Sequence, residues 1–309
     1  MVSTAQLPAQ MPPQVHSVEE AFRLGDPIGD QHGTVTSQDG TCLFYRYWPA
    51  PASVRSDRVV ILLHGIGYHS GPYKVVADGL NPRGLDVYAL DARGHGLSCG
   101  GRGYIGSASQ VAADVHSLVR LIRKQRPTSK IFLLGDSMGC NYALSYARDH
   151  SEELAGLVLL APAFYVDPGQ LLRLQSLFLM PYFVIGHRRP VIDLVGERLE
   201  ESTRNSSFAE QRRADPLAYK KVSFGYILDI QRLILGWKRK IAPRVRIPIL
   251  MIKGGKDRVV SQRDCVIFDR LSASRDKSFQ QYPEVHHTTL WDPQTPEILG
   301  QVASWVAKR

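Results

Sequence analysis

The sequence predicts an α/β fold in which a mostly parallel central sheet is flanked by helices. Three observations lead to this prediction: short apolar runs rich in β-branched residues, helical patterns that alternate with them, and an interruption after which the alternation resumes. Strands of a parallel sheet are buried on both faces, so they show as unbroken apolar runs. Right-handed crossovers between such strands place helices on both faces of the sheet.

Six strands are expected before the interruption. The first two, at 32–36 and 41–47, are joined by a turn at 38–40. Four apolar runs follow, and each is predicted to be a buried strand: 58–64, 85–91, 130–135 and 154–161. The first two of these runs lead directly into the loop segments HGIG and ARGHG.

Helical patterns separate these strands. The spacing of apolar residues from 75 to 80 predicts one helix, and apolar residues three and four apart from 111 to 122 predict a second. Pro127 ends the second helix, because proline cannot continue a helical hydrogen-bond pattern. A third helix is expected to open at Ser137.

The alternation stops after the sixth strand, between residues 163 and 246. This segment lacks β-branched runs and predicts helices at 171–179, 191–201, 207–213 and 224–237. The sheet pattern then resumes with a strand at 247–254, a helix at 261–271, a strand at 278–282 and a helix at 297–308. We therefore predict a core formed by residues 26–162 and 247–309, a helical cap inserted at 163–246, and a flexible tail at 1–25.

Charge is unevenly distributed along the chain. The 309 residues include 38 Lys and Arg against 29 Asp and Glu, a formal charge of +9. Counting along the sequence, the cap segment 163–246 holds fifteen of the basic residues and eight of the acidic ones. A basic cap that is also apolar could contact an anionic membrane surface, although an ordinary solvated helical face explains the charge equally well. Nucleic-acid binding is not expected, because no recognition motif is present.

Cysteine spacing and apolar segments bear on the compartment. The four cysteines lie far apart without a Cys-x-x-Cys pair, which argues against a disulfide framework and a cysteine zinc site: Cys42, Cys99, Cys140 and Cys265. No secretory signal and no apolar stretch of about 18 residues are found. Residues 176–186 are apolar enough to lie on a membrane surface or cover a pocket. We expect a cytoplasmic protein that associates with membranes at most peripherally.

A candidate nucleophile lies in Gly135-Asp136-Ser137-Met138-Gly139, directly after a predicted strand and before a predicted helix. A serine on so sharp a turn presents its hydroxyl outward, and the two glycines give clearance where the chain crosses itself. The pentapeptide alone is a weak signal, because a plain turn serine can also have this sequence. Its place between a buried strand and a helix favours the catalytic interpretation.

A serine hydroxyl needs a base to take its proton and an acid to orient that base. Asp257 follows the strand predicted at 247–254, and His286 and His287 follow the strand predicted at 278–282, so all lie on the sheet edge of Ser137. The position of the strands leaves the choice between the two histidines open. Two rival acids, Asp229 and Asp264, are interpreted as solvated helix-surface charges, and Asp136 is too constrained by its turn to reach a histidine.

An oxyanion requires two hydrogen-bond donors already in place. The N–H of Met138, the residue after the nucleophile, is one candidate, and the N–H of Ile66 in the HGIG loop is the other. His64 and His95 also lie in loops near the predicted site. We interpret both as packed, hydrogen-bonded loop residues.

Together these motifs resemble the monoacylglycerol lipase and lysophospholipase-like branch of the α/β-hydrolases. The matching segments are HGIGYHSGPY at 64–73, DARGHGLS at 91–98, GDSMG at 135–139, DPLAY at 215–219, GGKDRVV at 254–260 and YPEVHH at 282–287. The resemblance implies the α/β-hydrolase fold, Ser137 as nucleophile, Asp257 and His287 as its partners, and Ile66 and Met138 as oxyanion donors. It also implies that the cap shapes an acyl tunnel.

The sequence departs from this pattern at two positions. Glu284 stands where relatives often have glycine, and His286 stands where an aromatic residue is common. These departures concern the pocket and not the three catalytic positions.

The resemblance implies hydrolysis of a carboxylic ester with an apolar acyl chain, such as a monoacylglycerol or a lysophospholipid, with no cofactor and no metal. Two kinds of alternative stay open. The same three residues serve thioesterases, amidases, peptidases and carbon-carbon bond hydrolases, and a non-catalytic binding protein could retain the fold. Acyl length, head group and oligomeric state are not determined by the sequence.

Overall fold

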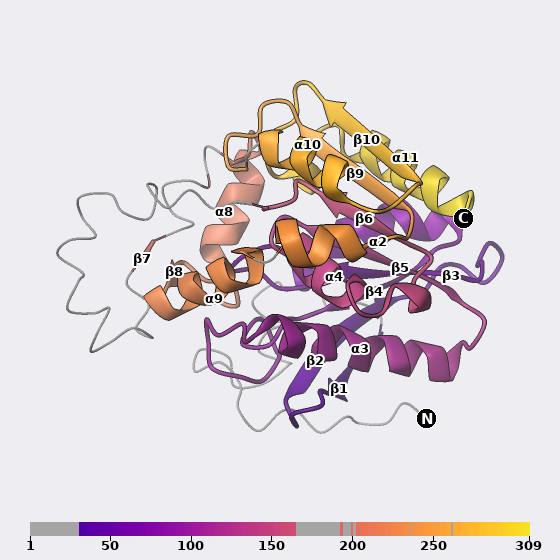
Figure 1. The fold of residues 1–309 in the computed structure, drawn as a ribbon, viewed down its shortest axis with the longest axis horizontal. Coiled ribbons are helices and arrows are strands. Elements are labelled where there is room, and N and C mark those ends of the chain that lie inside the picture. Colours follow the sequence, from indigo (N-terminus) through magenta and orange to yellow (C-terminus); the bar gives the residue numbers. More distant parts are fainter. Residues whose placement is uncertain (1–30, 165–191, 194–198, 200–201, 236, 261) are drawn as a thin grey trace.

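A computed structural model describes residues 31–164, 192–193, 199, 202–235, 237–260 and 262–309. An eight-stranded sheet runs through the centre in the order β1-β2-β4-β3-β5-β6-β9-β10 (Figure 1). The strands are β1 (Gln31–Thr36), β2 (Cys42–Trp48), β3 (Arg58–Leu63), β4 (Asp86–Leu90), β5 (Lys130–Asp136), β6 (Gly156–Leu160), β9 (Ile249–Gly254) and β10 (Lys277–Tyr282). Only the pairings β1–β2 and β2–β4 among these are antiparallel, which confirms the predicted, mostly parallel sheet.

The central strands are buried on both faces. Every residue of β4, β6 and β9 is buried, as are Val59 to Leu63 of β3. The edge strand β10 is mostly exposed. The unbroken apolar runs of the sequence therefore correspond to the interior of the sheet, where side chains on either face meet a layer of helices.

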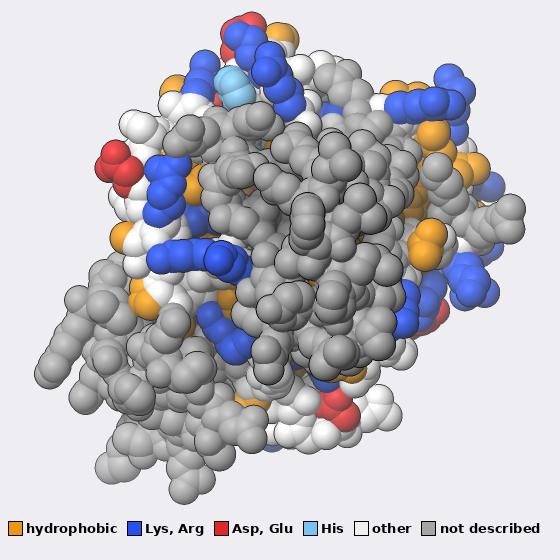
Figure 2. Space-filling model, turned by 90° about the vertical axis from the view of Figure 1, so that its left-hand side faces the viewer, with side chains coloured by type: hydrophobic (Ala, Val, Ile, Leu, Met, Phe, Trp, Pro, Cys, Tyr) orange, Lys and Arg blue, Asp and Glu red, His pale blue; other side chains and the backbone are white. Residues whose placement is uncertain are grey.

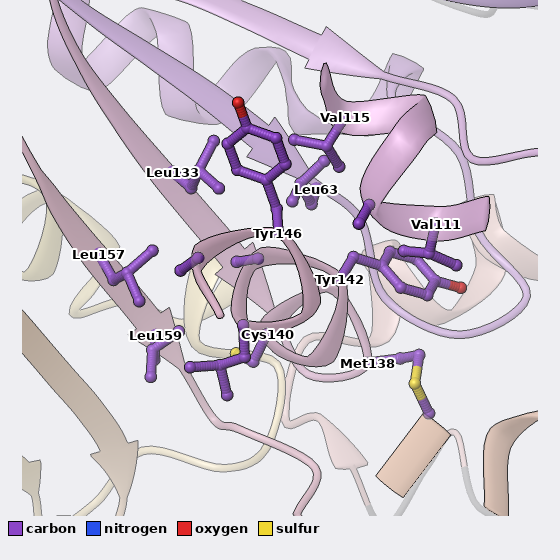
Figure 3. Packing of buried hydrophobic residues seen from close by; sticks show 14 of the residues in the cluster. Leu63, Val111, Val115, Leu133, Met138, Cys140, Tyr142, Tyr146, Leu157 and Leu159 are labelled. Atoms are coloured by element: carbon purple, nitrogen blue, oxygen red, sulfur yellow. The ribbon is translucent and has the colours of Figure 1, made fainter. Parts of the chain in front are cut away.

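Two layers of helices cover the sheet. One contains α3 (Ala108–Gln125), α4 (Gly139–Ala147) and α10 (Gln262–Leu271), and the other contains α2 (Lys74–Leu80) and α11 (Thr295–Ala307) (Figure 1). Figure 3 shows α4 beside α3, with Tyr142 near Val111 and Tyr146 near Leu63 and Leu133. The sheet thus has a separate hydrophobic layer on each face.

Helix α3 begins and ends where its sequence directs. Ser107 Oγ accepts a hydrogen bond from Gln110 N, while Gln110 Oε1 accepts one from Ser107 N, so the two side chains satisfy free donors at the helix start. The helix ends at Gln125, one residue before Arg126, which precedes proline and leaves the helical conformation. The apolar stripe between these ends faces the core.

Parts of the predicted cap segment lie among the described residues. They include α8 (Ser206–Ala214), α9 (Phe224–Leu235) and a π-helical turn (Trp237–Ile241). Figure 1 shows α8 and α9 beside the ends of the sheet strands. The helix predicted at 171–179, the apolar segment 176–186 and the tail 1–25 lie outside the described residues.

The helix predicted at 191–201 is wrong in its first part. Ile192–Asp193 forms a short strand, β7, which pairs antiparallel with β8 (Lys221–Val222). Two residues are too few to produce an alternating pattern, and the partner strand lies almost thirty positions further along the chain. Among the described residues no helix is long and apolar enough to span a bilayer.

Short 3-10 turns complete the described elements: Gly71–Tyr73, Asn81–Arg83, Ser151–Glu153, Ala242–Arg244 and Thr289–Trp291.

The boundaries predicted for the cap, at 162/163 and 246/247, stay a prediction.

Candidate active site

Ser137 stands on a strained turn between β5 and α4. Its φ of 51° lies in the left-handed region, and its N–H donates to the carbonyl of Leu160 at 2.8 Å. The helix predicted to open at Ser137 begins two residues later, at Gly139, because a residue in the left-handed region cannot belong to the helix. The sharp turn holds the Ser137 side chain away from both β5 and α4, as expected for a nucleophile at this position.

The flanking glycines are required by the close crossing of the chain. A Cβ at Gly135 would lie 2.5 Å from Cys140 N, and a Cβ at Gly139 would lie 1.9 Å from Leu63 O. Both neighbours are backbone atoms, which cannot rotate away. The turn therefore excludes any side chain at these two positions.

The structure brings Ser137, His287 and Asp257 into one chain of hydrogen bonds. His287 Nε2 lies 3.0 Å from Ser137 Oγ, and His287 Nδ1 lies 2.9 Å from Asp257 Oδ2. The other carboxylate oxygen of Asp257 accepts from the N–H groups of Val259 and Val260 at 2.8 and 3.1 Å. Asp257 follows β9 and His287 follows β10, so the strand ends converge as expected.

The protonation of this pair follows from its surroundings. Burial acts to raise the pKa of Asp257, but the charge and hydrogen bond of His287, together with the two backbone donors, bring that pKa below its ordinary value. Burial acts to lower the pKa of His287, yet Asp257 raises it above the ordinary 6.5. An ionised Asp257 therefore faces the imidazole and favours a proton on Nδ1, which leaves Nε2 free to accept from serine.

The loop that contains Ile66 is fixed by groups that the sequence analysis did not identify. Gly65 N donates to Tyr73 Oη at 2.9 Å, and the Tyr73 hydroxyl donates to Asp136 Oδ2 at 2.6 Å. The N–H groups of Ile66 and Met138 donate none of the loop hydrogen bonds found among the described residues. Asp136, which precedes the serine, thus connects the turn of Ser137 to the loop that faces it.

The cap holds the same loop from the opposite side. On α8, Arg212 Nη2 donates to Ile66 O at 3.0 Å. Tyr219 N donates to Gly67 O at 2.7 Å, and Gly67 N donates to Tyr226 Oη at 3.3 Å. The sequence around Ile66 does not predict these hydrogen bonds, because the cap residues that make them lie about 150 positions further along the chain.

His64 and His95 are packed loop histidines, as expected. His64 Nδ1 donates to Gly65 O at 2.9 Å and its Nε2 accepts from Ala92 N at 3.0 Å. His95 lies 2.9 Å from both the Arg93 carbonyl and the Tyr226 hydroxyl. Burial lowers the pKa of His64 to about 4 and that of His95 to about 3, so both are neutral at pH 7.

The rival residues lie elsewhere. His286 makes none of the contacts of His287, and its Nδ1 is buried without a hydrogen-bond partner in the part of the chain that the structure describes. The interpretation of Asp229 as a solvated surface charge is wrong, since only 7% of the residue is exposed. Its helix, α9, is covered by neighbouring segments on more than one side. The side chain of Asp264 is outside the described residues.

Comparisons with known proteins identify the family of the chain. A family model described as "Serine aminopeptidase, S33" matches residues 55–294, which is more than half of the chain. The chain belongs to this α/β-hydrolase family. The family resemblance seen in the sequence motifs is thereby confirmed.

Two similar proteins are lipases by name. A monoacylglycerol lipase of Mycolicibacterium smegmatis is 29% identical over 272 residues, which cover 86% of this α/β-hydrolase and 93% of the relative. A monoglyceride lipase of Mus musculus is 29% identical over 288 residues, which cover 89% and 90% of the two chains.

A solved structure shares the fold. The soluble variant of monoglyceride lipase from Saccharomyces cerevisiae, in complex with a substrate analog, matches with a TM-score of 0.73 and 21% identity. The match covers 89% of this α/β-hydrolase and 94% of the other chain.

Proposed function

We propose that this serine ester hydrolase cleaves monoacylglycerols through an acyl-enzyme on Ser137, with lysophospholipids as a related substrate class. The observation that carries the proposal is the hydrogen-bonded chain from Ser137 through His287 to Asp257. The two lipases that cover most of the chain support the lipid substrate.

Each residue has a defined role in the proposed reaction. His287 Nε2 takes the hydroxyl proton as Ser137 Oγ attacks the ester carbonyl, and Asp257 stabilises the resulting imidazolium. The N–H groups of Ile66 and Met138 donate to the developing oxyanion, where one such donor contributes about 3 kcal/mol. His287 then gives the proton to the leaving alcohol, and water attacks the acyl-enzyme by the same route in reverse.

The preorganisation of the oxyanion loop supports this assignment. Tyr73 holds the loop on one side, and Arg212 of the cap holds the Ile66 carbonyl on the other. The Gly65 N–H and the Ile66 carbonyl belong to the peptides on either side of the one that carries the Ile66 N–H, and the carbonyl of that peptide, Gly65 O, accepts from His64 Nδ1. These three hydrogen bonds limit how the Ile66 N–H can rotate. A fixed donor costs no reorganisation when the charge develops.

The description of the family favours a second candidate, hydrolysis of peptides or other amides by the same three residues. The acyl-enzyme chemistry is shared, so only the leaving group distinguishes the two candidates. The thioesterase and carbon-carbon bond hydrolase alternatives differ in the same way.

Substrate profiling with Ser137→Ala tests the proposal. We expect a fluorophosphonate probe to label the wild type at Ser137, and monoacylglycerols to be cleaved faster than matched thioesters, amides and aminoacyl anilides. Ser137→Ala should lose both labelling and at least about 10³-fold in kcat. Faster cleavage of the anilides would favour the peptidase, and absent labelling with unchanged folding would refute the acyl-enzyme.

We also propose where in the cell the protein acts. The basic cap is proposed to contact anionic membrane surfaces, which would bring the site to lipid substrates. A cytoplasmic location is proposed from the four cysteines, which are all free thiols.

A further inference from the structure

A second cluster of ionisable side chains lies at the far end of α4 from Ser137. His116 belongs to α3, His150 follows α4, and Glu153 ends the 3-10 turn that comes next. One nitrogen or oxygen atom from each of the three lies within 4.8 Å of the others. Since α4 has nine residues and rises about 1.5 Å per residue, roughly 13 Å of helix separates this cluster from the turn of Ser137.

The donor atoms of the cluster already face one another. His150 Nδ1 lies 3.3 Å from Glu153 Oε1, and His116 Nδ1 lies 3.7 Å from Glu153 Oε2. The two imidazole rings are stacked, with centroids 4.9 Å apart and planes inclined by 22°. Ligand atoms about 2.0–2.1 Å from a tetrahedral metal ion are about 3.3 Å apart, close to the two separations from Glu153. The stacked imidazole rings must rotate before both Nδ1 lone pairs can point at one ion.

Tyr146 provides the outer support that metal sites commonly have. Its hydroxyl donates to Glu153 Oε2 at 2.7 Å, and its ring stacks on His150 with centroids 4.7 Å apart. Figure 3 shows Tyr146 extending from α4 past Leu133 and Val115, with its hydroxyl away from the helix. A phenol that fixes the carboxylate leaves one oxygen free to bind an ion.

Exposure and charge are compatible with an ion. The side chains of His116, His150 and Glu153 are 33, 32 and 28% exposed, which leaves water access for a fourth ligand. Arg123 also lies nearby, but its guanidinium donates to the Glu153 carbonyl at 2.8 Å and not to the carboxylate.

We propose that His116 Nδ1, His150 Nδ1 and a carboxylate oxygen of Glu153 bind a divalent transition-metal ion, best matched by Zn²⁺, with water as the fourth ligand. Two imidazoles and one carboxylate suit Zn²⁺ better than Ca²⁺ or Mg²⁺, which prefer sites made of oxygen. The ion ties α3 to the segment that follows α4. It is distinct from a cysteine zinc site, against which the cysteine spacing argues.

Metal titration of the full chain tests the site. After removal of metals with EDTA, calorimetric titration with Zn²⁺ should show one equivalent bound, and Co²⁺ should give the visible absorption of a tetrahedral site. His116→Ala and His150→Ala should each weaken binding tenfold or more. His287→Ala should bind as the wild type does, which excludes the catalytic histidine as the ligand.

Two matched variants separate an ion site from a mere hydrogen-bond network. Tyr146→Phe removes the hydroxyl that contacts both Glu153 Oε2 and His116 Nδ1 but keeps all three ligands, so it should bind Zn²⁺ less than tenfold more weakly. His32→Ala removes an exposed histidine on β1 and should change nothing. Zn²⁺ should raise the melting temperature of the wild type, Tyr146→Phe and His32→Ala, but not that of His116→Ala.

The melting temperatures of all variants in EDTA establish that they fold. Absence of stoichiometric Zn²⁺ binding by the wild type would overturn the proposal. Equal binding by a folded His116→Ala/His150→Ala variant would also overturn it, because the ion would then lie at another residue.

Discussion

His287 is the residue whose protonation governs the proposed chemistry. It lies between a hydroxyl and a carboxylate that come from distant parts of the chain. The carboxylate favours the imidazolium, and burial opposes it. The balance between these two effects sets the pH at which the base becomes available.

The pH dependence of kcat/KM should follow this balance. Because Asp257 raises the pKa of His287 above 6.5, the wild type should lose activity as pH falls through a value above 6.5. Below that pH, the imidazolium cannot accept the serine proton; above it, the neutral imidazole can. Initial rates with a soluble short-chain ester from pH 5 to 9 measure this loss of activity on the acidic side of the pH profile.

Asp257→Asn provides the check on this interpretation. The amide removes the charge that raises the pKa of His287, so the pH at which activity is lost should move to a lower value. In addition, kcat should fall by about 10⁴-fold. If activity is lost at the same pH in this variant as in the wild type, a group other than His287 controls the pH dependence.

At the scale of secondary structure elements, the turn between β5 and α4 depends on close backbone packing. Gly139→Ala places a Cβ 1.9 Å from Leu63 O and 2.9 Å from His64 O. We expect the free energy of unfolding to fall by about 3 kcal/mol and esterase activity to be lost, since α4 must move away from β3. Urea unfolding followed by circular dichroism measures the change.

Gly101→Ala is the matched control for this substitution. Gly101 does not have a positive φ, and its nearest neighbour for a new Cβ is Tyr104 Cβ at 3.9 Å. The free energy of unfolding should change by about 1 kcal/mol or less. A similar loss of unfolding free energy in both variants would contradict the conclusion that close backbone packing requires glycine at position 139.

A buried ion pair joins α3 to the loop after β4. Arg93 makes two hydrogen bonds to Asp114, from Nε at 2.7 Å and Nη2 at 2.6 Å, and a third to Asp39 at 2.8 Å. Arg93→Ala should lower the free energy of unfolding by about 3–5 kcal/mol, because Asp114 stays buried without its partner. Chemical denaturation at pH 7 tests this.

Lys74→Ala gives the comparison for a surface pair. Lys74 and Asp78 are paired on α2 with 42 and 61% of their side chains exposed. Water screens such a pair, so the loss should be below about 1 kcal/mol. Equal losses in the two variants would show that burial does not set the cost.

At the scale of the whole molecule, the face that carries α8 and α9 has several exposed basic side chains. Figure 2 shows Lys and Arg side chains at several places on the face that carries α8 and α9. The exposed basic residues of α8, β8 and α9 and the segment between them include Arg213, Lys220, Lys221 and Arg232. A face of this charge is attracted to anionic lipid headgroups.

Vesicle sedimentation tests the proposed membrane contact. The bound fraction should rise with the content of anionic lipid and fall as salt is added, because ions screen the attraction. Lys220→Glu/Lys221→Glu should bind less than Arg120→Glu/Lys124→Glu, which changes the net charge equally but on α3. Binding indifferent to lipid charge and to salt would refute the contact.

Much of the fold was predictable because burial on two faces leaves a direct trace in the sequence. The runs that form β3, β4, β5, β6 and β9 are apolar except for charged residues at or next to their ends, and the patterns between them are helical. The pairing of β7 with β8 was not predictable, because two-residue strands carry no periodicity. The burial of Asp229 was also not predictable, because the sequence of a helix does not show which segments pack over its charged residues.

The sequence by itself determined the candidate nucleophile, the order of its partners and the sheet edge where they meet, because these follow from local turn chemistry and strand direction. Strand positions left His286 and His287 open, the family resemblance implied His287, and the tertiary structure shows that His287 faces Ser137. It alone revealed that Tyr73, Asp136 and Arg212 hold the loop of Ile66, and that two histidines meet Glu153 behind α4. Such contacts depend on side-chain directions and on segments packed from far along the chain, which no local pattern records.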